Sequence, residues 1–216
     1  MRALVDRWRK VWQFHAFRVQ LMWSAPAFVC ALILLRLYLD VVEVRSAVAL
    51  YDPLIAFLPA LDLKWIVYSI TYSALLLGVS MIAFHPLAFL LTLRAAVVVI
   101  VMRVVCLFAL PLDPPVGIIP LVDPMIQLPF AYPTLTRDLF FSWHVTVMAM
   151  FAFTVPGKDL KIIFSTFGAL IAALLLLQHA QYTISVVAAP CFAYAACGIA
   201  KPFTVGANGP GIPGTH

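Results

Sequence analysis

Residues 137–144 contain the side chains best suited to chemistry. Arg137 and Asp138 open this stretch, and Ser142, Trp143 and His144 close it, directly before a long apolar run. A histidine can transfer protons near neutral pH, and a guanidinium binds phosphate oxygens. The position of His144 beside an apolar run places it at the mouth of an expected membrane helix. The stretch therefore predicts phosphoryl chemistry at a membrane surface.

The composition assigns the chain to the integral membrane proteins. Of its 216 residues 64% are hydrophobic and 11% are charged, and the mean hydropathy is +1.04. A soluble domain of this size could not bury so much apolar surface. We interpret the net charge of +5 as a topology signal and do not expect nucleic-acid binding. No metal or cofactor is expected, because the cysteines lie in apolar runs without ligand spacing: Cys30, Cys106, Cys191 and Cys197. A pigment or haem ligand among the histidines stays open.

Apolar runs of spanning length predict an all-α, six-helix membrane bundle with an N-terminal basic interfacial helix. The domains expected are a basic amphipathic segment (1–20), a six-span membrane domain (21–200) and an irregular tail (201–216). The spans are expected at residues 21–39, 65–84, 87–110, 139–155, 160–177 and 182–199. Residues 44–63 are expected to dip back toward the membrane. The proline-rich loop 111–136 is expected to be neither helix nor central strand.

The distribution of basic residues predicts the orientation. The N-terminal segment and the turns expected on the same side of the membrane are rich in arginine and lysine. Most acidic residues lie in the loops expected on the other side. The positive-inside rule then places both termini in the cytoplasm, here of a bacterial inner membrane. Residues 2–19 interleave cations with aromatics, which suits either an amphipathic helix on an anionic surface or a plain topology signal. His144 and the connection near residue 180 would lie together at the outer face.

Three stretches resemble the sphingomyelin-synthase-like branch of the type 2 phosphatidic acid phosphatase superfamily. Residues 137–144 resemble its phe-phe-ser-gly-his motif, with Trp143 in the place of glycine. Residues 178–190 resemble its second motif, in which his-tyr-thr-ile-asp precedes an apolar helix. The segment around Arg103, leading into the proline-rich loop, resembles the arginine-containing third span. The resemblance covers about residues 65–200 and implies the same fold.

The resemblance implies a catalytic unit that this chain does not complete. The family uses one histidine as proton donor, a second as nucleophile and an aspartate that orients the nucleophile. The first matches His144, but the other two positions hold Gln181 and Ser185. An amide cannot form a phospho-enzyme, and a serine cannot stabilise an imidazolium. His179 is a candidate replacement nucleophile; on a helix it would point about 200° away from Gln181, and only an irregular connection would let it reach inward.

Three functions remain open at this point. The first is a catalytically degenerate protein of this fold that serves as a structural, lipid-binding or assembly subunit, in contact with membrane lipids and other membrane proteins. The second is an active lipid phosphotransferase or lipid phosphatase at the outer leaflet. The third is a transporter or channel component, which only the intramembrane Arg94 and Arg103 support. In the first two, Arg103 and Arg137 are the expected ligands of a lipid phosphate.

Overall fold

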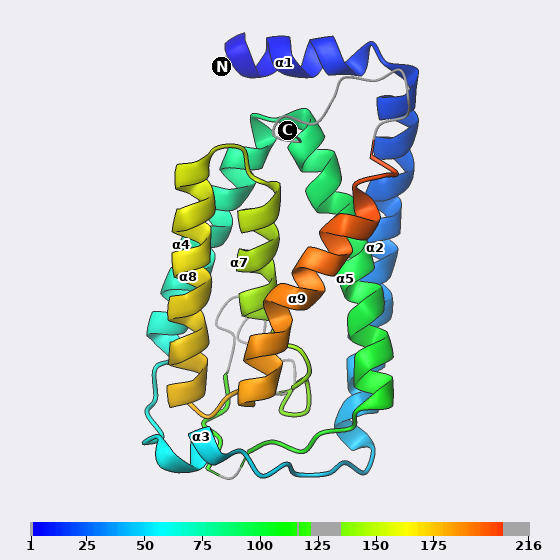
Figure 1. Cartoon of the computed structure of the whole chain (residues 1–216). Coiled ribbons are helices and arrows are strands. Elements are labelled where there is room, and N and C mark those ends of the chain that lie inside the picture. Colours follow the sequence, from blue (N-terminus) through cyan, green and yellow to red (C-terminus); the bar gives the residue numbers. More distant parts are fainter. Residues whose placement is uncertain (1, 116, 122–134, 205–216) are drawn as a thin grey trace.

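The computed structural model describes residues 2–115, 117–121 and 135–204 (Figure 1). The described residues form helices and irregular connections, and their only ladder contact is an isolated bridge between Val48 and Leu112. The helices are α1 (Arg2–Trp12), α2 (His15–Val44), α3 (Pro53–Phe57), α4 (Lys64–Ala83), α5 (Pro86–Ala109), α7 (Trp143–Thr154), α8 (Lys158–Leu177) and α9 (Thr183–Ala200). The predicted all-α class is confirmed.

Four helices are long and apolar enough to cross a membrane: α4, α5, α8 and α9. At a rise of about 1.5 Å per residue, helices of 18 to 24 residues match the hydrocarbon core of a bilayer. α7 is also apolar but has only 12 residues. These helices confirm an integral membrane protein.

The long helices run up and down side by side, and α1 lies across one end of them (Figure 1). The start of α2 and the end of α9 lie at this same end, which we call the terminal end; α3 lies at the other end, the loop end. α7 packs between α8 and α9, while α5 packs against α2 and α9. This packing makes α7 and α5 the inner helices, and their side chains are the most extensively buried.

A close approach between α4 and α7 fixes the centre of the largest core cluster. Gly78 lies against the ring of Phe151, so that a Cβ at position 78 would come within 2.6 Å of Phe151 Cε2. Phe151 in turn packs against Phe164 of α8, with ring centroids 5.2 Å apart. The absent side chain at Gly78 therefore provides the space that the Phe151 ring occupies.

Most predicted spans agree with the helices to within two or three residues, but two differ. α2 covers residues 15–44 where 21–39 was predicted, because buried Phe17 extends it at one end and buried Val42 at the other. α7 begins at Trp143 although a span from residue 139 was predicted. Instead, the carbonyl of Asp138 accepts from Gln181, the carbonyl of Phe141 accepts from Arg103 of α5, and the backbone N of Ser142 donates to Ser185 of α9.

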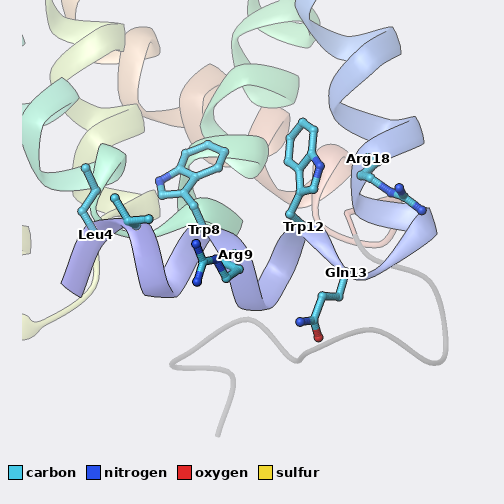
Figure 2. A pocket seen from close by; sticks show the side chains of 7 residues that line it. Leu4, Trp8, Arg9, Trp12, Gln13 and Arg18 are labelled. Atoms are coloured by element: carbon cyan, nitrogen blue, oxygen red, sulfur yellow. The ribbon is translucent and has the colours of Figure 1, made fainter. Parts of the chain in front are cut away.

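The basic N-terminal segment is also shorter than the predicted range 1–20. α1 ends at Trp12, and α2 begins at His15. Trp8 and Trp12 point from α1 toward the bundle, whereas Gln13 points away from it (Figure 2). The indole of Trp8 packs edge-on against Phe17 and Phe89, and its Nε1 donates to the Ala83 carbonyl at 2.8 Å. The aromatics of α1 thus fasten it across the terminal end.

The irregular segments predicted near the loop end and the C-terminus are described only in part. Residues 111–115, 117–121 and 135–136 are non-helical, as predicted for the proline-rich loop, and the remainder of that loop lies outside the described residues. The predicted tail is described only to residue 204, and residues 201–204 form a turn.

Candidate functional site

The two motif stretches meet inside the bundle near the loop end. The backbone N of Ser142, just before α7, donates to the carbonyl of Ser185 in the first turn of α9 at 3.1 Å. Gln181 Nε2 donates to the carbonyl of Asp138 at 3.2 Å. Hydrogen bonds from a backbone N–H and a side-chain amide therefore join two segments that lie more than 40 residues apart in the sequence. This contact brings Gln181 and Ser185 to the residues that precede His144.

Arg103 connects α5 to the same segment. Its side chain is almost fully buried and donates to the carboxylate of Asp138 and to the carbonyl of Phe141. Its guanidinium also lies 5.6 Å from the ring centroid of Phe141 and 6.0 Å from that of Trp143. Ion pairing, hydrogen bonding and aromatic contact thus satisfy this buried cation within the protein.

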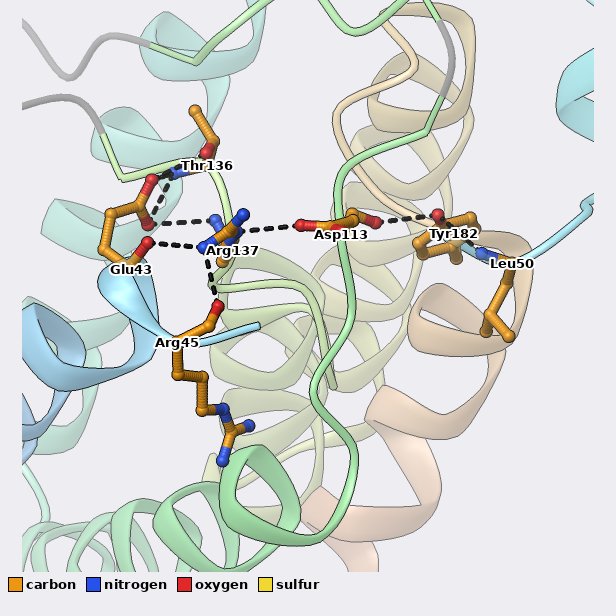
Figure 3. A network of polar contacts seen from close by, with 7 residues as sticks. All are labelled: Glu43, Arg45, Leu50, Asp113, Thr136, Arg137 and Tyr182. Carbon is orange, nitrogen blue, oxygen red and sulfur yellow. Dashed lines mark hydrogen bonds and ion pairs between the residues drawn. The ribbon is translucent and has the colours of Figure 1, made fainter. Parts of the chain in front are cut away.

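Arg137 is held by a second network at the loop end (Figure 3). Its Nε donates to Asp113 Oδ1 at 2.8 Å, and its Nη1 donates to the carbonyls of Glu43 and Arg45, both at 2.7 Å. The Glu43 carboxylate accepts from the backbone N of Arg137 and from the backbone N and hydroxyl of Thr136. Arg137 thereby joins the end of α2 to Asp113, near the start of the proline-rich loop.

Tyr182 extends this network to the start of α9. Its hydroxyl donates to the Asp113 carbonyl at 2.8 Å and accepts from the backbone N of Leu50 at 3.1 Å (Figure 3). The ring is buried, so the hydroxyl has little access to water and depends on these two partners. Tyr182 therefore fixes the second motif to two loops at once.

Asp52 secures the same stretch from the side of α3. Its carboxylate accepts from the backbone N of Thr183 at 2.6 Å and from the Thr183 hydroxyl at 2.9 Å, while it also caps α3 at Leu54 and Ile55. Burial raises the pKa of Asp52, but the hydrogen bonds from Thr183, Ile55 and Leu54 outweigh it. The pKa consequently lies below its ordinary value of 3.8.

His144 lies in the first turn of α7 and is half-buried. Its ring meets that of Tyr68 on α4 edge-on, with centroids 6.0 Å apart. The Tyr68 hydroxyl donates to the Leu121 carbonyl at 3.1 Å, which holds the aromatic partner in place. His144 is therefore positioned by α4, on a different side of the segment from the Arg103 contact of its neighbour Trp143.

His179 occupies an irregular turn, as its candidacy as a nucleophile required. α8 ends at Leu177, and His179 has φ of 53°, a left-handed conformation. Its Nε2 lies 3.1 Å from the carbonyl of Leu58, which identifies Nε2 as the protonated nitrogen, since a carbonyl only accepts. Nδ1 then carries the lone pair, is buried and has no hydrogen-bond partner among the described residues.

A group of buried polar atoms near the motif contact has no hydrogen-bond partner within the part of the chain that the structure describes. Its members are Ser142 Oγ, Ser185 Oγ, Gln181 Oε1 and Gln178 Oε1. Buried polar groups are normally satisfied, so these atoms mark a position where water or the polar part of a ligand would be stabilised. The unpartnered Nδ1 of His179 lies one position from Gln178, so the buried polar atoms without a partner comprise hydroxyls, amides and one imidazole nitrogen.

No family model, curated protein or solved structure matches this chain. The described residues also contain no group of three histidine, cysteine, aspartate or glutamate side chains that could hold a metal ion.

Sequence reasoning missed the residues that hold the site together. Asp52, Asp113 and Glu43 entered the sequence argument only as acidic residues of the loops, and Tyr182 only as part of a motif. The available signal was the excess of acids on the side where Arg103 and Arg137 were expected. Buried or half-buried guanidiniums need counter-charges, so these acids were candidates for their partners.

Proposed function

We propose that the chain spans the membrane six times, through α2, α4, α5, α7, α8 and α9, with α1 on the cytoplasmic surface of a bacterial inner membrane. The alternating helix directions support this topology, as does the position of the start of α2 and the end of α9 at the same end of the bundle (Figure 1). α7 covers only about 18 Å, so the non-helical residues before it complete the crossing. Irregular backbone is tolerated at membrane depth when protein surrounds it, as it does here.

Within this frame, we propose a catalytically degenerate lipid-phosphotransferase-like protein that acts as a structural, lipid-binding or assembly subunit of a membrane complex. One observation carries this proposal: Asp138 binds both Arg103, the expected phosphate ligand, and Gln181. Its carboxylate pairs with Arg103, and its carbonyl accepts from Gln181, which stands in the position of the family nucleophile. The site is thus organised for internal cohesion.

The energetics favour the same conclusion. A lipid phosphate at Arg103 would compete with Asp138 and the Phe141 carbonyl, which already bind this buried guanidinium. At Arg137 it would compete with Asp113 and two backbone carbonyls. We therefore assign a structural role to both arginines. We place the lipid contact at the unpartnered hydroxyls of Ser142 and Ser185 and the unpartnered amide oxygen of Gln181.

A second candidate, an active phosphotransferase or lipid phosphatase at the outer leaflet, has support from His179. The Leu58 carbonyl orients its imidazole and leaves Nδ1 as a buried lone pair, which is the form that a nucleophilic histidine requires. Nδ1 faces Gly117, since a Cβ at that position would lie 3.7 Å from it. Attack through Nδ1 would therefore need substrate to enter beside Gly117.

Turnover assays on the full-length protein in liposomes distinguish these functions. The substrates are phosphatidylcholine or phosphatidylethanolamine with ceramide or diacylglycerol as acceptor, and phosphatidic acid for hydrolysis. We expect no turnover above that of empty liposomes, together with copurification of a larger complex from native membranes. Turnover that both His144→Ala and His179→Ala abolish would establish the enzyme instead. Turnover that persists in both variants would indicate a contaminant.

A further inference from the structure

A cavity of about 500 Å³ lies at the terminal end, far from the site described above. α1 forms one wall, the turn between α4 and α5 forms the floor, and the end of α7 forms the far side. Its apolar lining includes Val11, Phe14, Phe84, Leu87, Ala88 and Pro156. Arg7 and Lys10 of α1 line it as well, and we call this pair its cationic rim. The cavity thus combines an apolar interior with a cationic rim, which are the two features of a phospholipid site.

The cations on the rim are placed to share one anion. Arg7 and Lys10 are three residues apart on a helix, so their side chains leave the same face. Among the described residues, Lys10 makes no hydrogen bond or ion pair with the protein. Arg7 uses Nη1 for the Phe84 carbonyl at 3.2 Å and for His85 Nε2 at 2.9 Å. The remaining N–H groups of Arg7 and the ammonium of Lys10 are available for phosphate oxygens.

His85 keeps this arrangement rigid. Its Nδ1 lies 3.0 Å from the Met81 carbonyl and therefore carries the proton, so Nε2 is the acceptor for Arg7. The imidazole is neutral in this arrangement and adds no charge to the rim. Together with the bond from Trp8 to Ala83, this contact holds α1 over the cavity before any ligand binds. A preformed site loses less entropy on binding than one that must be ordered.

The charge of the surrounding surface matches an anionic lipid. The described basic residues of the terminal end are Arg7, Arg9, Lys10, Arg18, Lys158, Lys161 and Lys201, and the acidic ones are Asp6 and Asp159. Such an excess attracts anionic headgroups, by about 1 kcal/mol for each cation near the surface. From the cavity, its rim and this field, we infer that one phospholipid with an anionic headgroup binds between α1 and the α4–α5 turn. Its phosphate lies on Arg7 and Lys10, and one acyl chain lies along Phe84, Leu87 and Pro156.

This inference does not depend on the proposed function, because it concerns the opposite end of the bundle. It is tested by native mass spectrometry of the full-length protein titrated with phosphatidylglycerol or phosphatidylcholine. We expect one retained phosphatidylglycerol and weaker retention of phosphatidylcholine. Lys10→Gln should weaken phosphatidylglycerol binding by more than about fivefold, because it removes a direct contact to the phosphate in addition to the attraction of one surface cation. Circular dichroism and size-exclusion chromatography verify that each variant is folded.

Two matched control substitutions distinguish lipid binding at this cavity from general electrostatic attraction of the lipid to the basic surface. Lys161→Gln removes the same charge from the same end, on α8, and Arg9→Gln removes a cation from the other flank of α1, where it lines a different cavity (Figure 2). Both should weaken phosphatidylglycerol binding less than Lys10→Gln does, because neither residue lines this cavity. Equal weakening by all three substitutions would overturn the inference, because it would show a diffuse electrostatic effect.

A photoreactive phosphatidylglycerol with a diazirine in its acyl chain tests the position directly. Crosslinks should map to residues 84–88 and 154–156, and inorganic phosphate should not compete with the lipid. Crosslinks confined to other helices would reject the acyl-chain position. Displacement of the lipid by inorganic phosphate would show that the cationic rim recognises soluble phosphate and not a membrane lipid.

Discussion

The carboxylate of Asp52 accepts the backbone N–H of Thr183 at 2.6 Å, across 131 positions of the chain. One side chain thereby caps α3 and fastens the first residue of α9. Above its pKa the carboxylate carries the charge that makes these hydrogen bonds strong. The start of the second motif is consequently held by a group that can titrate.

The titration of Asp52 predicts a loss of stability in acid. Its pKa is lower in the folded protein than the ordinary value of 3.8, so the folded state binds fewer protons than the unfolded chain. Its contribution is fully present above about pH 4 and is lost as the pH falls through the lower folded-state pKa. Thermal unfolding in detergent should show a steeper decline below this pH for wild type than for Asp52→Asn. Parallel profiles would contradict the prediction.

The buried pair of Arg103 and Asp138 predicts strong coupling between two substitutions. Asp138→Ala leaves a buried guanidinium without its counter-charge and should destabilise the protein by about 3 kcal/mol. The double variant Arg103→Met with Asp138→Ala should recover part of this loss, because no unpaired charge remains. A double-mutant cycle of denaturation free energies measures the coupling. Simple additivity would show that the pair contributes nothing specific.

Gly78 predicts a steric effect with a built-in control. Gly78→Ala brings a Cβ to within 2.6 Å of the Phe151 ring and should cost about 1–3 kcal/mol through overpacking. Gly198→Ala, in α9, meets no atom within 4 Å and should be neutral or stabilise the helix by up to about 1 kcal/mol. Midpoints of thermal unfolding compare the two. A tolerated Gly78→Ala would mean that the Phe151 ring moves freely.

Two hydroxyls at the start of α9 predict opposite outcomes. The Thr183 hydroxyl donates to Asp52, so Thr183→Val should cost about 1 kcal/mol. The Ser185 hydroxyl is buried and has no partner among the described residues, so Ser185→Ala should be neutral or stabilising in lipid-free detergent. If the hydroxyl contacts lipid, as proposed, Ser185→Ala should also reduce the lipid that copurifies. A large destabilisation by Ser185→Ala without any lipid would contradict both expectations.

The helices were largely predictable because neighbouring residues in the sequence determine them. Runs of apolar residues ended by Phe84-His85-Pro86 or Pro156-Gly157-Lys158 mark segments that must satisfy their backbone groups internally in lipid. The late start of α7 was not predictable, because residues 138–142 are apolar enough for a helix. Their backbone conformation depends on Arg103 and Gln181, which lie 35 or more positions away.

The site was predictable only as far as its motifs. The order of the spans indicated that residues near 144 and 181 share one end of the bundle, and the contact of Ser142 with Ser185 brings those stretches together. The partners of Arg103 and Arg137 were not indicated by spacing, because each carboxylate comes from a different loop. The resemblance and the topology predicted a lipid phosphate on these arginines, and the folded chain gives each of them an aspartate as a partner; the phosphate contact stays a prediction.

The shortness of α7 has a consequence for biogenesis. A helix of 12 residues is too short to be retained in the bilayer by its own hydrophobicity during synthesis. The residues before it have backbone groups that bond to Arg103 of α5, to Gln181 and to Ser185 of α9. Since α9 is synthesised after α7, the proposed six-span topology implies that α7 reaches its final depth only when α9 has been made. Ribosome-bound chains truncated before α9 should therefore leave the region of Trp143 accessible to water-soluble reagents, and release of the complete chain should close it.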